Sequence, residues 1–507
     1  MLAAISAGVL LATGTVASAG STSQIKRGGT LTVLESGTQW PNLDPALDAQ
    51  DAADATMLDA IYGQLLEVGP KGTFVPDLAT GYYYSNGNLT LNITIRKGVK
   101  FSDGTPFSAQ AVAASMNRVL SSSFSCICDA NFKDVTSIVA SGNTVKMNLA
   151  TPSAIIVESI VGEGPDWTIP PDALSSETEA TFEQSPFGAG PFKVVSNIPG
   201  NVLTLTRNPN YWAKGEPYLS SLIFQSVAGG DQAANYALQA GSGQVLTGLS
   251  TPSIITGDKS QYQVIDLPGS ANKAITYNPN SAPFNNVLAR EAVEYATNGK
   301  VLLNALAPRF GTVGESEATP ADLYYEATVP GYPAYNLTKA KSLVQQLGGL
   351  SFTLVCNGGS SLESELCVAL QSQLANAGIT MNPTPVPLAT YLSDVAHKTY
   401  QAFLNDVGGF DPDVGVQGLP SDFASTGSLS GYTDGSLDGL INKTEAFVSS
   451  KNRQKAFDAV YAYIASHADA DVMFAVDGAV VADKNVVGLT YFSGPARVLN
   501  FETVYVK

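Results

Sequence analysis

The sequence is poor in the residues on which most catalytic and metal sites depend. Its 507 residues include two histidines, His397 and His467, and four cysteines, and only 14% of the residues are charged. A Ser-His-Asp arrangement could therefore use only these histidines, each of which is expected at the surface or at a helix end. The chain lacks the Gly-x-Ser-x-Gly sequence of a serine nucleophile, the histidine motifs of zinc enzymes and the Gly-x-x-x-x-Gly-Lys-Ser/Thr loop that holds phosphates. These absences favour a binding protein, although 44 acidic residues leave a carboxylate-based hydrolase as an alternative.

Positive charge is also scarce. The chain has 27 basic and 44 acidic residues, which gives a formal net charge of −17. An acidic surface repels phosphate backbones and anionic lipid headgroups, so we expect neither a nucleic-acid partner nor direct binding to a membrane surface.

Long apolar runs are confined to the start of the sequence. The residues from Leu2 to Val16 are apolar or small, and this stretch falls short of the ~20 residues that span a bilayer. Ala17-Ser18-Ala19 follows and fits a secretory cleavage site, although no lysine or arginine precedes the run. We predict a signal peptide over residues 1–19 and an exported protein, periplasmic or extracellular. The alternatives are an N-terminal core helix or a membrane anchor.

The four cysteines allow one disulfide to be predicted. Cys356 ends a strand-like run and Cys367 lies in the helix-like segment that follows, so a bridge between them is geometrically reasonable, with two buried thiols as the alternative. Cys126 and Cys128 are too close for an easy mutual bridge, and their pairing stays open. No Cys-x-x-Cys pairs occur, so we predict neither a metal site nor a cofactor.

Length and periodicity predict an α/β protein with two lobes. A single hydrophobic core stops growing at roughly 250–300 residues, so a chain of 507 should contain at least two. Residues 30–34 and the alternating run 89–95 predict strands, residues 54–66 predict a helix, and Ser108 can cap a helix that ends near Leu120. In the C-terminal half, a helix capped by Asn336 precedes a strand–helix–strand pattern over 352–356, 363–377 and 379–386, for which parallel pairing is the default.

Eight motifs in chain order resemble the extracytoplasmic solute-binding proteins of peptide-type ABC transporters, family 5. The densest similarity lies in Ile61–Leu66, Phe74–Ala79 and Ile95–Pro106. It continues through Phe187–Phe192, Arg207–Trp212, Tyr277-Asn278 with Pro283-Phe284, Arg290–Ala296 and Asp411–Asp413.

This resemblance implies the two-lobed periplasmic-binding-protein fold of type II, with mixed sheets, an extra domain and a hinge. Domain one would combine residues 28–45, 185–270 and 486–507, domain two would be the insertion 46–184, and domain three would span 271–485. The hinge would lie at Ser270–Thr276 and Asp483–Val486, because a few residues can absorb the change in backbone angles.

The resemblance also implies a ligand cleft lined by Ser36–Trp40, Gly164–Ile169 and Asn405–Asp411. The candidate ligand-binding residues are Gln39, Trp40, Trp167, Arg309, Asp406, Phe410 and Asp411. Trp40 and Trp167 either stack on the ligand or fill a local core. Asp406 and Asp411 could receive an amine, although Asp411 could equally shape a turn, and Arg309 could receive a carboxylate.

Gly408 occupies the position of the aspartate that holds the amino end in dipeptide binders, so the substrate class stays open. The expected partners are a small solute, peptide or oligosaccharide, and the subunits of an ABC permease, and the protein is expected to be a monomer. With two histidines, direct nickel coordination is disfavoured. The alternatives are a secreted oligosaccharide-binding receptor or a sensor of the same fold, besides the hydrolase.

Overall fold

The computed structural model describes residues 25–37, 40, 42–47, 52–69, 73–121, 131–171, 173, 182, 185–249, 261–408, 415, 418–426, 428–446, 449–492 and 498–507. The predicted signal peptide and the pair Cys126 and Cys128 therefore lie outside the described residues. The strands are β1 (Thr30–Ser36), β2 (Leu66–Val68), β3 (Phe74–Pro76), β4 (Ala79–Ser85), β5 (Thr90–Ile95), β6 (Val135–Ser141), β7 (Thr144–Leu149), β8 (Phe192–Ile198), β9 (Val202–Arg207), β10 (Ser221–Val227), β11 (Val245–Thr247), β12 (Tyr262–Leu267), β13 (Ala271–Tyr277), β14 (Thr312–Val313), β15 (Leu350–Asn357), β16 (Ile379–Val386), β17 (Ala402–Gly408), β18 (Ala470–Ala475), β19 (Gly478–Asp483), β20 (Val486–Val487), β21 (Thr490–Tyr491), β22 (Leu499–Asn500) and β23 (Tyr505–Val506). The helices are α1 (Ala52–Tyr62), α2 (Ala109–Val119), α3 (Ile155–Glu158), α6 (Gly230–Gln239), α7 (Val287–Ala296), α8 (Gly299–Leu306), α9 (Leu337–Gln346), α10 (Ser361–Ala375), α11 (Leu388–Ala396), α12 (Gly418–Phe423), α13 (Gly435–Ala446) and α14 (Ser450–His467), with a 3₁₀ turn at Gly164–Asp166.

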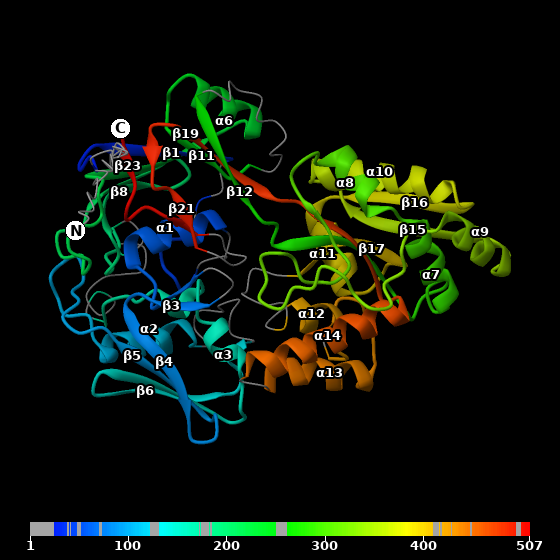
Figure 1. Ribbon diagram of the computed structural model, residues 1–507, viewed down its shortest axis with the longest axis horizontal. Helices are drawn as coiled ribbons and strands as arrows, with labels where there is room; N and C mark the ends of the chain where they lie inside the picture. Colours follow the sequence, from blue (N-terminus) through cyan, green and yellow to red (C-terminus); the bar gives the residue numbers. More distant parts are fainter. Residues whose placement is uncertain are drawn as a thin grey trace, which may run out of the picture.

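These elements form two lobes, which lie on either side of Figure 1. Lobe 1 (the described residues of 25–267 and 478–507) contains a seven-stranded sheet in the order β12-β19-β11-β1-β10-β9-β8 and a four-stranded sheet in the order β4-β5-β7-β6. Lobe 2 (those of 271–475) contains a six-stranded sheet in the order β14-β18-β13-β17-β15-β16. Each sheet of lobe 1 has its own buried apolar cluster, and the sheet of lobe 2 is covered on both faces. The α/β class and the two-lobed architecture are confirmed.

Two short segments connect the lobes. Residues 268–270 lead from β12 into β13, and residues 476–477 lead from β18 into β19. The amide of Gly269 donates a hydrogen bond to Asp477 Oδ1 at 2.9 Å, so the two crossings lie side by side. The second hinge segment predicted at Asp483–Val486 is wrong, because β19 pairs with β11 and β12 inside lobe 1. An apolar run shows that a strand exists, but only its pairing shows to which sheet it belongs.

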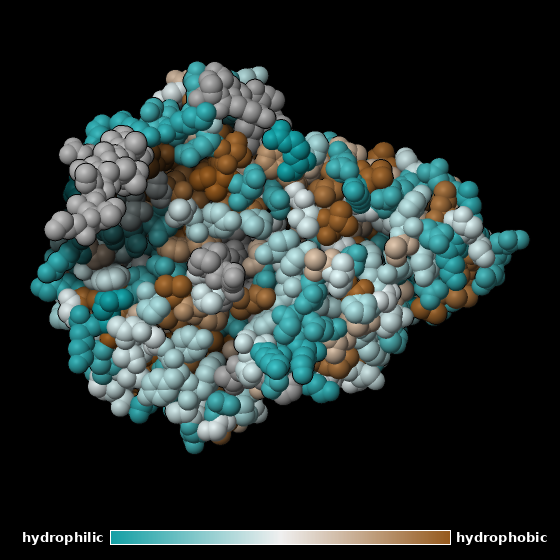
Figure 2. Space-filling model, viewed as in Figure 1, coloured by the Kyte–Doolittle hydropathy of each residue, from teal (hydrophilic) through white to brown (hydrophobic). Residues whose placement is uncertain are grey.

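Local signals for helix caps and parallel pairing are confirmed. Ser108 Oγ accepts a hydrogen bond from the amide of Ala111 at the start of α2, and Asn336 Oδ1 accepts one from Lys339 at the start of α9. β15 and β16 pair in parallel on either side of α10. None of the helices in these ranges has both the length and the apolar character needed to cross a bilayer. Hydrophilic residues cover much of the face in Figure 2, with separate apolar patches between them.

One local prediction differs from the structure, and one predicted strand is more deeply buried than its alternating pattern alone indicates. The first helix ends at Tyr62 and not at Leu66, because Gly63 adopts a φ of 67° and the chain continues into β2. The alternating strand β5 is almost wholly buried, because β4 and β7 flank it and Asn92 donates from Nδ2 to Ser85 Oγ at 2.8 Å. A polar residue in alternation therefore does not have to face water.

Candidate functional site

The crossings bring the ends of strands from the two main sheets toward each other. β12 runs parallel to β1 through its antiparallel pairing with β19, so both strands end at the same edge of the lobe 1 sheet. In lobe 2, Ala271 at the start of β13 pairs with Gly408, the last residue of β17. β1 and β17 thus end at the two edges that the crossings join. Ligands of open α/β sheets bind at such carboxyl ends, which makes the space between these edges the candidate cleft.

On the side away from the crossings, the two lobes touch. In Figure 1, α3 of lobe 1 meets α13 and α14 of lobe 2 below the centre, whereas the crossings lie above it. The amide of Ala154 donates to the carbonyl of Glu445 at 2.8 Å, and Arg453 forms an ion pair with Glu158. We call this region, where α3 meets α13 and α14, the mouth of the cleft. A groove of about 710 Å³ lies there between the lobes, lined by Thr73, Phe74, Tyr82, Tyr84, Ala154, Val157, Glu158, Leu323, Tyr324, Ser450, Lys451, Arg453 and Gln454.

The two candidate tryptophans are both held by lobe 1. Trp40 is half-buried against the lobe 1 core, and its Nε1 donates to Asn197 Oδ1 on β8 at 3.1 Å. Trp167 is fully buried in the same apolar cluster, beside the 3₁₀ turn, and its Nε1 has no hydrogen-bond partner among the described residues. The buried position of Trp167 matches the alternative in which this side chain fills a local core. Its role in ligand stacking has no support from this position.

Asp406 already has a charged partner. Its Oδ1 lies 2.6 Å from Lys273 Nζ, which also lies 3.3 Å from Glu363 Oε1. Burial opposes the charge on Lys273, but the two carboxylates outweigh it and raise the pKa of Lys273. The Asp406 side chain remains 51% exposed. A ligand amine at Asp406 would therefore compete with Lys273.

Arg309 lies near the second crossing. It is exposed and has a φ of 75°, which is rare for a residue other than glycine. A Cβ atom at nearby Gly311 would lie 2.3 Å from the carbonyl oxygen of Ala475, which ends β18. Within the described part of the chain, no hydrogen bond or ion pair joins Arg309 to the other candidates. Gln39, Phe410 and Asp411 lie outside the described residues.

Buried carboxyl groups at the edge of lobe 2 were missed by the sequence analysis. Glu317 is 1% exposed, and burial raises its pKa to about 8. Asp422 accepts a hydrogen bond from Asn405 Nδ2 at 3.0 Å, and burial raises its pKa to about 7. No motif marks Glu317 in the sequence, because its position depends on Asn272, whose Nδ2 donates to the carbonyls of residues 316–318.

Gly408 is required by this packing. Its φ is 115°, and a Cβ atom there would lie 3.1 Å from the carbonyl oxygen of Glu317 and 3.2 Å from that of Ser270. A side chain at this position would be strained by the backbone angle and would press on the first crossing. A side chain such as that of aspartate is therefore disfavoured at this position.

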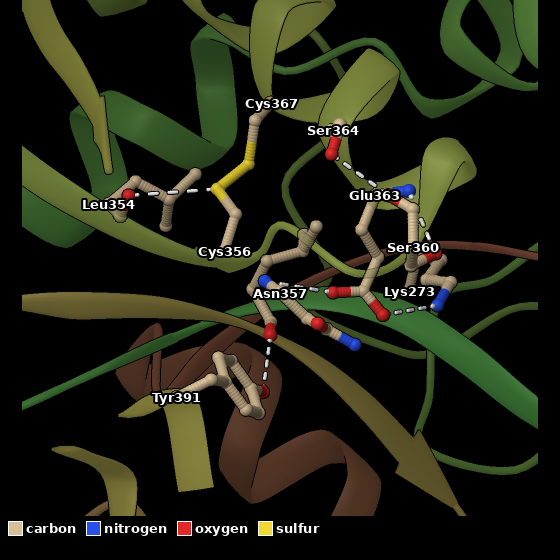
Figure 3. Close-up of a disulfide and its surroundings, with 10 residues drawn as sticks. Lys273, Leu354, Cys356, Asn357, Ser360, Glu363, Ser364, Cys367 and Tyr391 are labelled. Carbon is tan, nitrogen blue, oxygen red and sulfur yellow. Dashed lines mark hydrogen bonds and ion pairs between the residues drawn. A yellow bond between two sulfur atoms is a disulfide. The ribbon is translucent and has the colours of Figure 1, made fainter. Parts of the chain in front are cut away.

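A disulfide stabilises the same lobe. Cys356 and Cys367 are bonded, with 6.8 Å between their Cα atoms, and join the end of β15 to α10. Figure 3 shows the disulfide close to Glu363, which accepts from the amide of Asn357 at 3.3 Å and pairs with Lys273. The covalent bond thus holds the segment that carries one partner of Lys273.

One other cluster could in principle hold a cation. Among the described residues, one cluster of three acidic residues has possible ligand atoms that all lie within 4.8 Å of one another. It consists of Glu67, Asp77 and Glu502 of lobe 1. Asp77 accepts from Trp212 Nε1 at 2.9 Å. Burial, with neighbouring carboxylates adding to it, raises the pKa of Glu67 to about 10. Protonated carboxyls explain this cluster without an ion.

Two α/β lobes with facing strand ends and two adjacent crossings define the two-lobed fold of periplasmic binding proteins. More particularly, the chain belongs to the Bacterial extracellular solute-binding proteins, family 5 Middle, whose family model matches residues 73–426. It is 26% identical over 371 residues to the glutathione-binding protein GsiB of Salmonella choleraesuis, covering 72% of this chain and 71% of that protein.

Solved structures show the same fold. The substrate-binding protein CtaP of an ABC transporter of Listeria monocytogenes superposes with a TM-score of 0.81 at 22% identity, over 95% of this chain and 100% of that one. The oligopeptide-binding protein AppA of Bacillus subtilis, in complex with a nonapeptide, superposes with a TM-score of 0.75 at 20% identity, over 96% and 100% of the two chains. The predicted membership of family 5 is confirmed, and the protein is a solute-binding protein.

Proposed function

We propose that this protein is the exported substrate-binding component of an ABC importer. It captures a small solute between its lobes, works as a monomer and delivers the solute unaltered to the permease. The observation that carries this proposal is the pair of facing sheet edges joined by residues 268–270 and 476–477. Family membership supports the binding role, and it supports a location outside the cytoplasm.

The crossings are the proposed hinge. They are short, they lie side by side, and each connects the end of a strand in one sheet to the start of a strand in the other. Domain three then ends near residue 475, before β19, while domains one and two share lobe 1. A ligand closes the lobes only if it binds the closed form more tightly than the open form, because equal affinity shifts nothing.

The proposed solute is peptide-like and carries an amino group. The named relatives bind glutathione and a nonapeptide. At the lobe 2 edge of this protein, the half-exposed carboxylate of Asp406 is the candidate partner of such an amino group, and Lys273 is already paired. Such an edge favours a cationic group over an anion. Trp40 and Arg309 would complete the site, together with Gln39, Phe410 and Asp411, which follow β1 and β17 in the sequence.

Native mass spectrometry of the purified protein tests this proposal. We expect a co-purifying peptide-like solute with an intact backbone, and calorimetry should then show binding of that solute at a single site. An oligosaccharide in its place would favour the receptor alternative. Release of a cleaved solute would favour a hydrolase and would contradict the proposed role.

A further inference from the structure

The mouth of the cleft contains an ion pair that is buried and spans both lobes. Arg453 of α14 pairs with Glu158 of α3, and their side chains are only 2% and 5% exposed. Glu158 belongs to lobe 1 and Arg453 to lobe 2, so any separation of the lobes at this side must break the pair.

Arg453 is positioned by lobe 2. Its Nε donates to the carbonyl of Thr444 at 2.8 Å. Its guanidinium carbon lies 4.8 Å from the centre of the Tyr324 ring and 5.7 Å from that of Phe457. The charged end is therefore held ready for Glu158 without much further loss of side-chain freedom.

A second contact lies beside this pair. The Ala154 amide donates to the Glu445 carbonyl at 2.8 Å, and the Ala154 carbonyl accepts from Tyr84 Oη at 3.3 Å. Ala154 is thus fixed on lobe 1 by Tyr84 and meets lobe 2 through its own amide. The two contacts join the region of α3 to α13 and α14, which lie away from both crossings in Figure 1.

The energetics of such a pair depend on the lobe position. In the closed form each charge has lost its water and is balanced by the other. In an open form both charges would be hydrated separately. Removing one partner leaves an unbalanced buried charge only in the closed form, which makes that form less favourable.

We propose that the Glu158–Arg453 pair is a latch that sets the balance between closed and open forms. It thereby controls solute affinity from a position at the mouth, through the closed fraction. The latch itself rests on the contacts above, whereas its effect on affinity rests on the proposed function.

Paired cysteines can measure this balance without any solute. The parent chain carries Cys126→Ser and Cys128→Ser. In one version Ala154→Cys and Glu445→Cys report closure by the rate of disulfide formation, since residues joined through a backbone hydrogen bond are close enough to be bridged. In a second version Ala154→Cys alone reports opening by its alkylation rate, because Ala154 is 5% exposed. The ratio of the two rates follows the closed-to-open ratio over its whole range.

We expect Glu158→Gln to lower this ratio about tenfold or more, because it removes the carboxylate that pairs with buried Arg453 in the closed form. Arg453→Met should do the same. The double variant should lose less than the two single effects combined, because both substitutions act on the same ion pair. Lys451→Met is the matched control: Lys451 lies on the same helix, lines the same groove, is exposed and forms no ion pair with the described residues, so the ratio should not change.

An unchanged ratio in Glu158→Gln, with unchanged thermal unfolding, would overturn the latch. If that variant does not fold, Arg453→Met decides by the same criterion. Calorimetry with reduced glutathione and with a nonapeptide separates the latch from the proposed function. A changed rate ratio with no binding of either probe contradicts the proposed peptide-like solute and leaves the latch standing. Binding of a probe with an unchanged rate ratio supports the peptide-like solute and contradicts the latch.

Discussion

The mouth of the cleft and the interior of lobe 2 both bury carboxyl groups, but they treat the charge differently. At the mouth, Glu158 is buried against Arg453 from the other lobe. In the interior of lobe 2, Asp471 on β18 has an oxygen with no hydrogen-bond partner among the described residues, as does nearby Glu294 on α7. Burial raises the pKa of Asp471 to about 7 and that of Glu294 well above its ordinary value.

The difference separates two uses of a buried acid. A paired carboxylate keeps its charge and can be released when its partner moves away, so it suits a contact between moving lobes. An unpaired carboxyl group avoids the cost of burial by keeping its proton, so its contribution depends on pH.

The pH dependence of stability should show that the interior acids are protonated. The pKa values of Asp471 and Asp422 are about 7 in the folded protein, above those of ordinary carboxyls. Between roughly pH 4 and 7 the folded protein then binds more protons than the unfolded chain. The free energy of unfolding should therefore fall with rising pH, by about 1.4 kcal/mol per pH unit for each such group. Urea denaturation at pH 5 and pH 8 measures this, and greater stability at pH 8 would contradict it.

Asp471→Asn should remove part of this dependence. The neutral amide resembles the protonated acid, so we expect little change at pH 5 and a gain of about 2 kcal/mol or more at pH 8. Glu365→Gln is the control, since Glu365 is exposed on α10 and should leave the difference between the two pH values as it is. A loss of stability from Asp471→Asn at pH 8 would mean that Asp471 is charged and paired.

Removing the disulfide tests how far lobe 2 relies on a covalent bond next to its charges. Cys356 and Cys367 are separated by 11 residues in sequence, and opening a loop of this length should cost about 2–3 kcal/mol. Cys356→Ser with Cys367→Ser should show this loss in thermal unfolding at any pH from 5 to 8. A loss that appears only at high pH would point to a disturbed carboxyl cluster and not to the missing bond.

The sequence predicted the elements better than their assembly. Ser108 and Asn336 marked helix starts because a cap is formed by neighbours in the chain. The disulfide and the parallel strands around α10 were also within reach of local patterns. The second crossing was misplaced, since the sheet that β19 joins is set by contacts with β11 and β12.

For the candidate site, the sequence and the family resemblance predicted chain segments but not the buried charged residues. The ends of β1 and β17 lie at the edges that the crossings join. Glu317 was missed because Asn272 places it, and Glu158 and Arg453 were missed because they lie 295 residues apart. Buried charges of this kind carry no periodic signal in the sequence, so only the folded structure shows which of them are paired.

Asp406→Asn gives the smallest expected effect on stability. Asp406 forms an ion pair like Glu158, but its side chain is 51% exposed, and an exposed pair contributes about 1 kcal/mol or less because water and salt screen it. Chemical denaturation should therefore change little, whereas Glu363→Gln, which removes the more buried partner of Lys273, should destabilise more. If Asp406 also receives the amine of a solute, its removal should weaken binding about tenfold or more while stability stays close to that of the parent. A large loss of stability with unchanged binding would place Asp406 with the buried acids and outside the site.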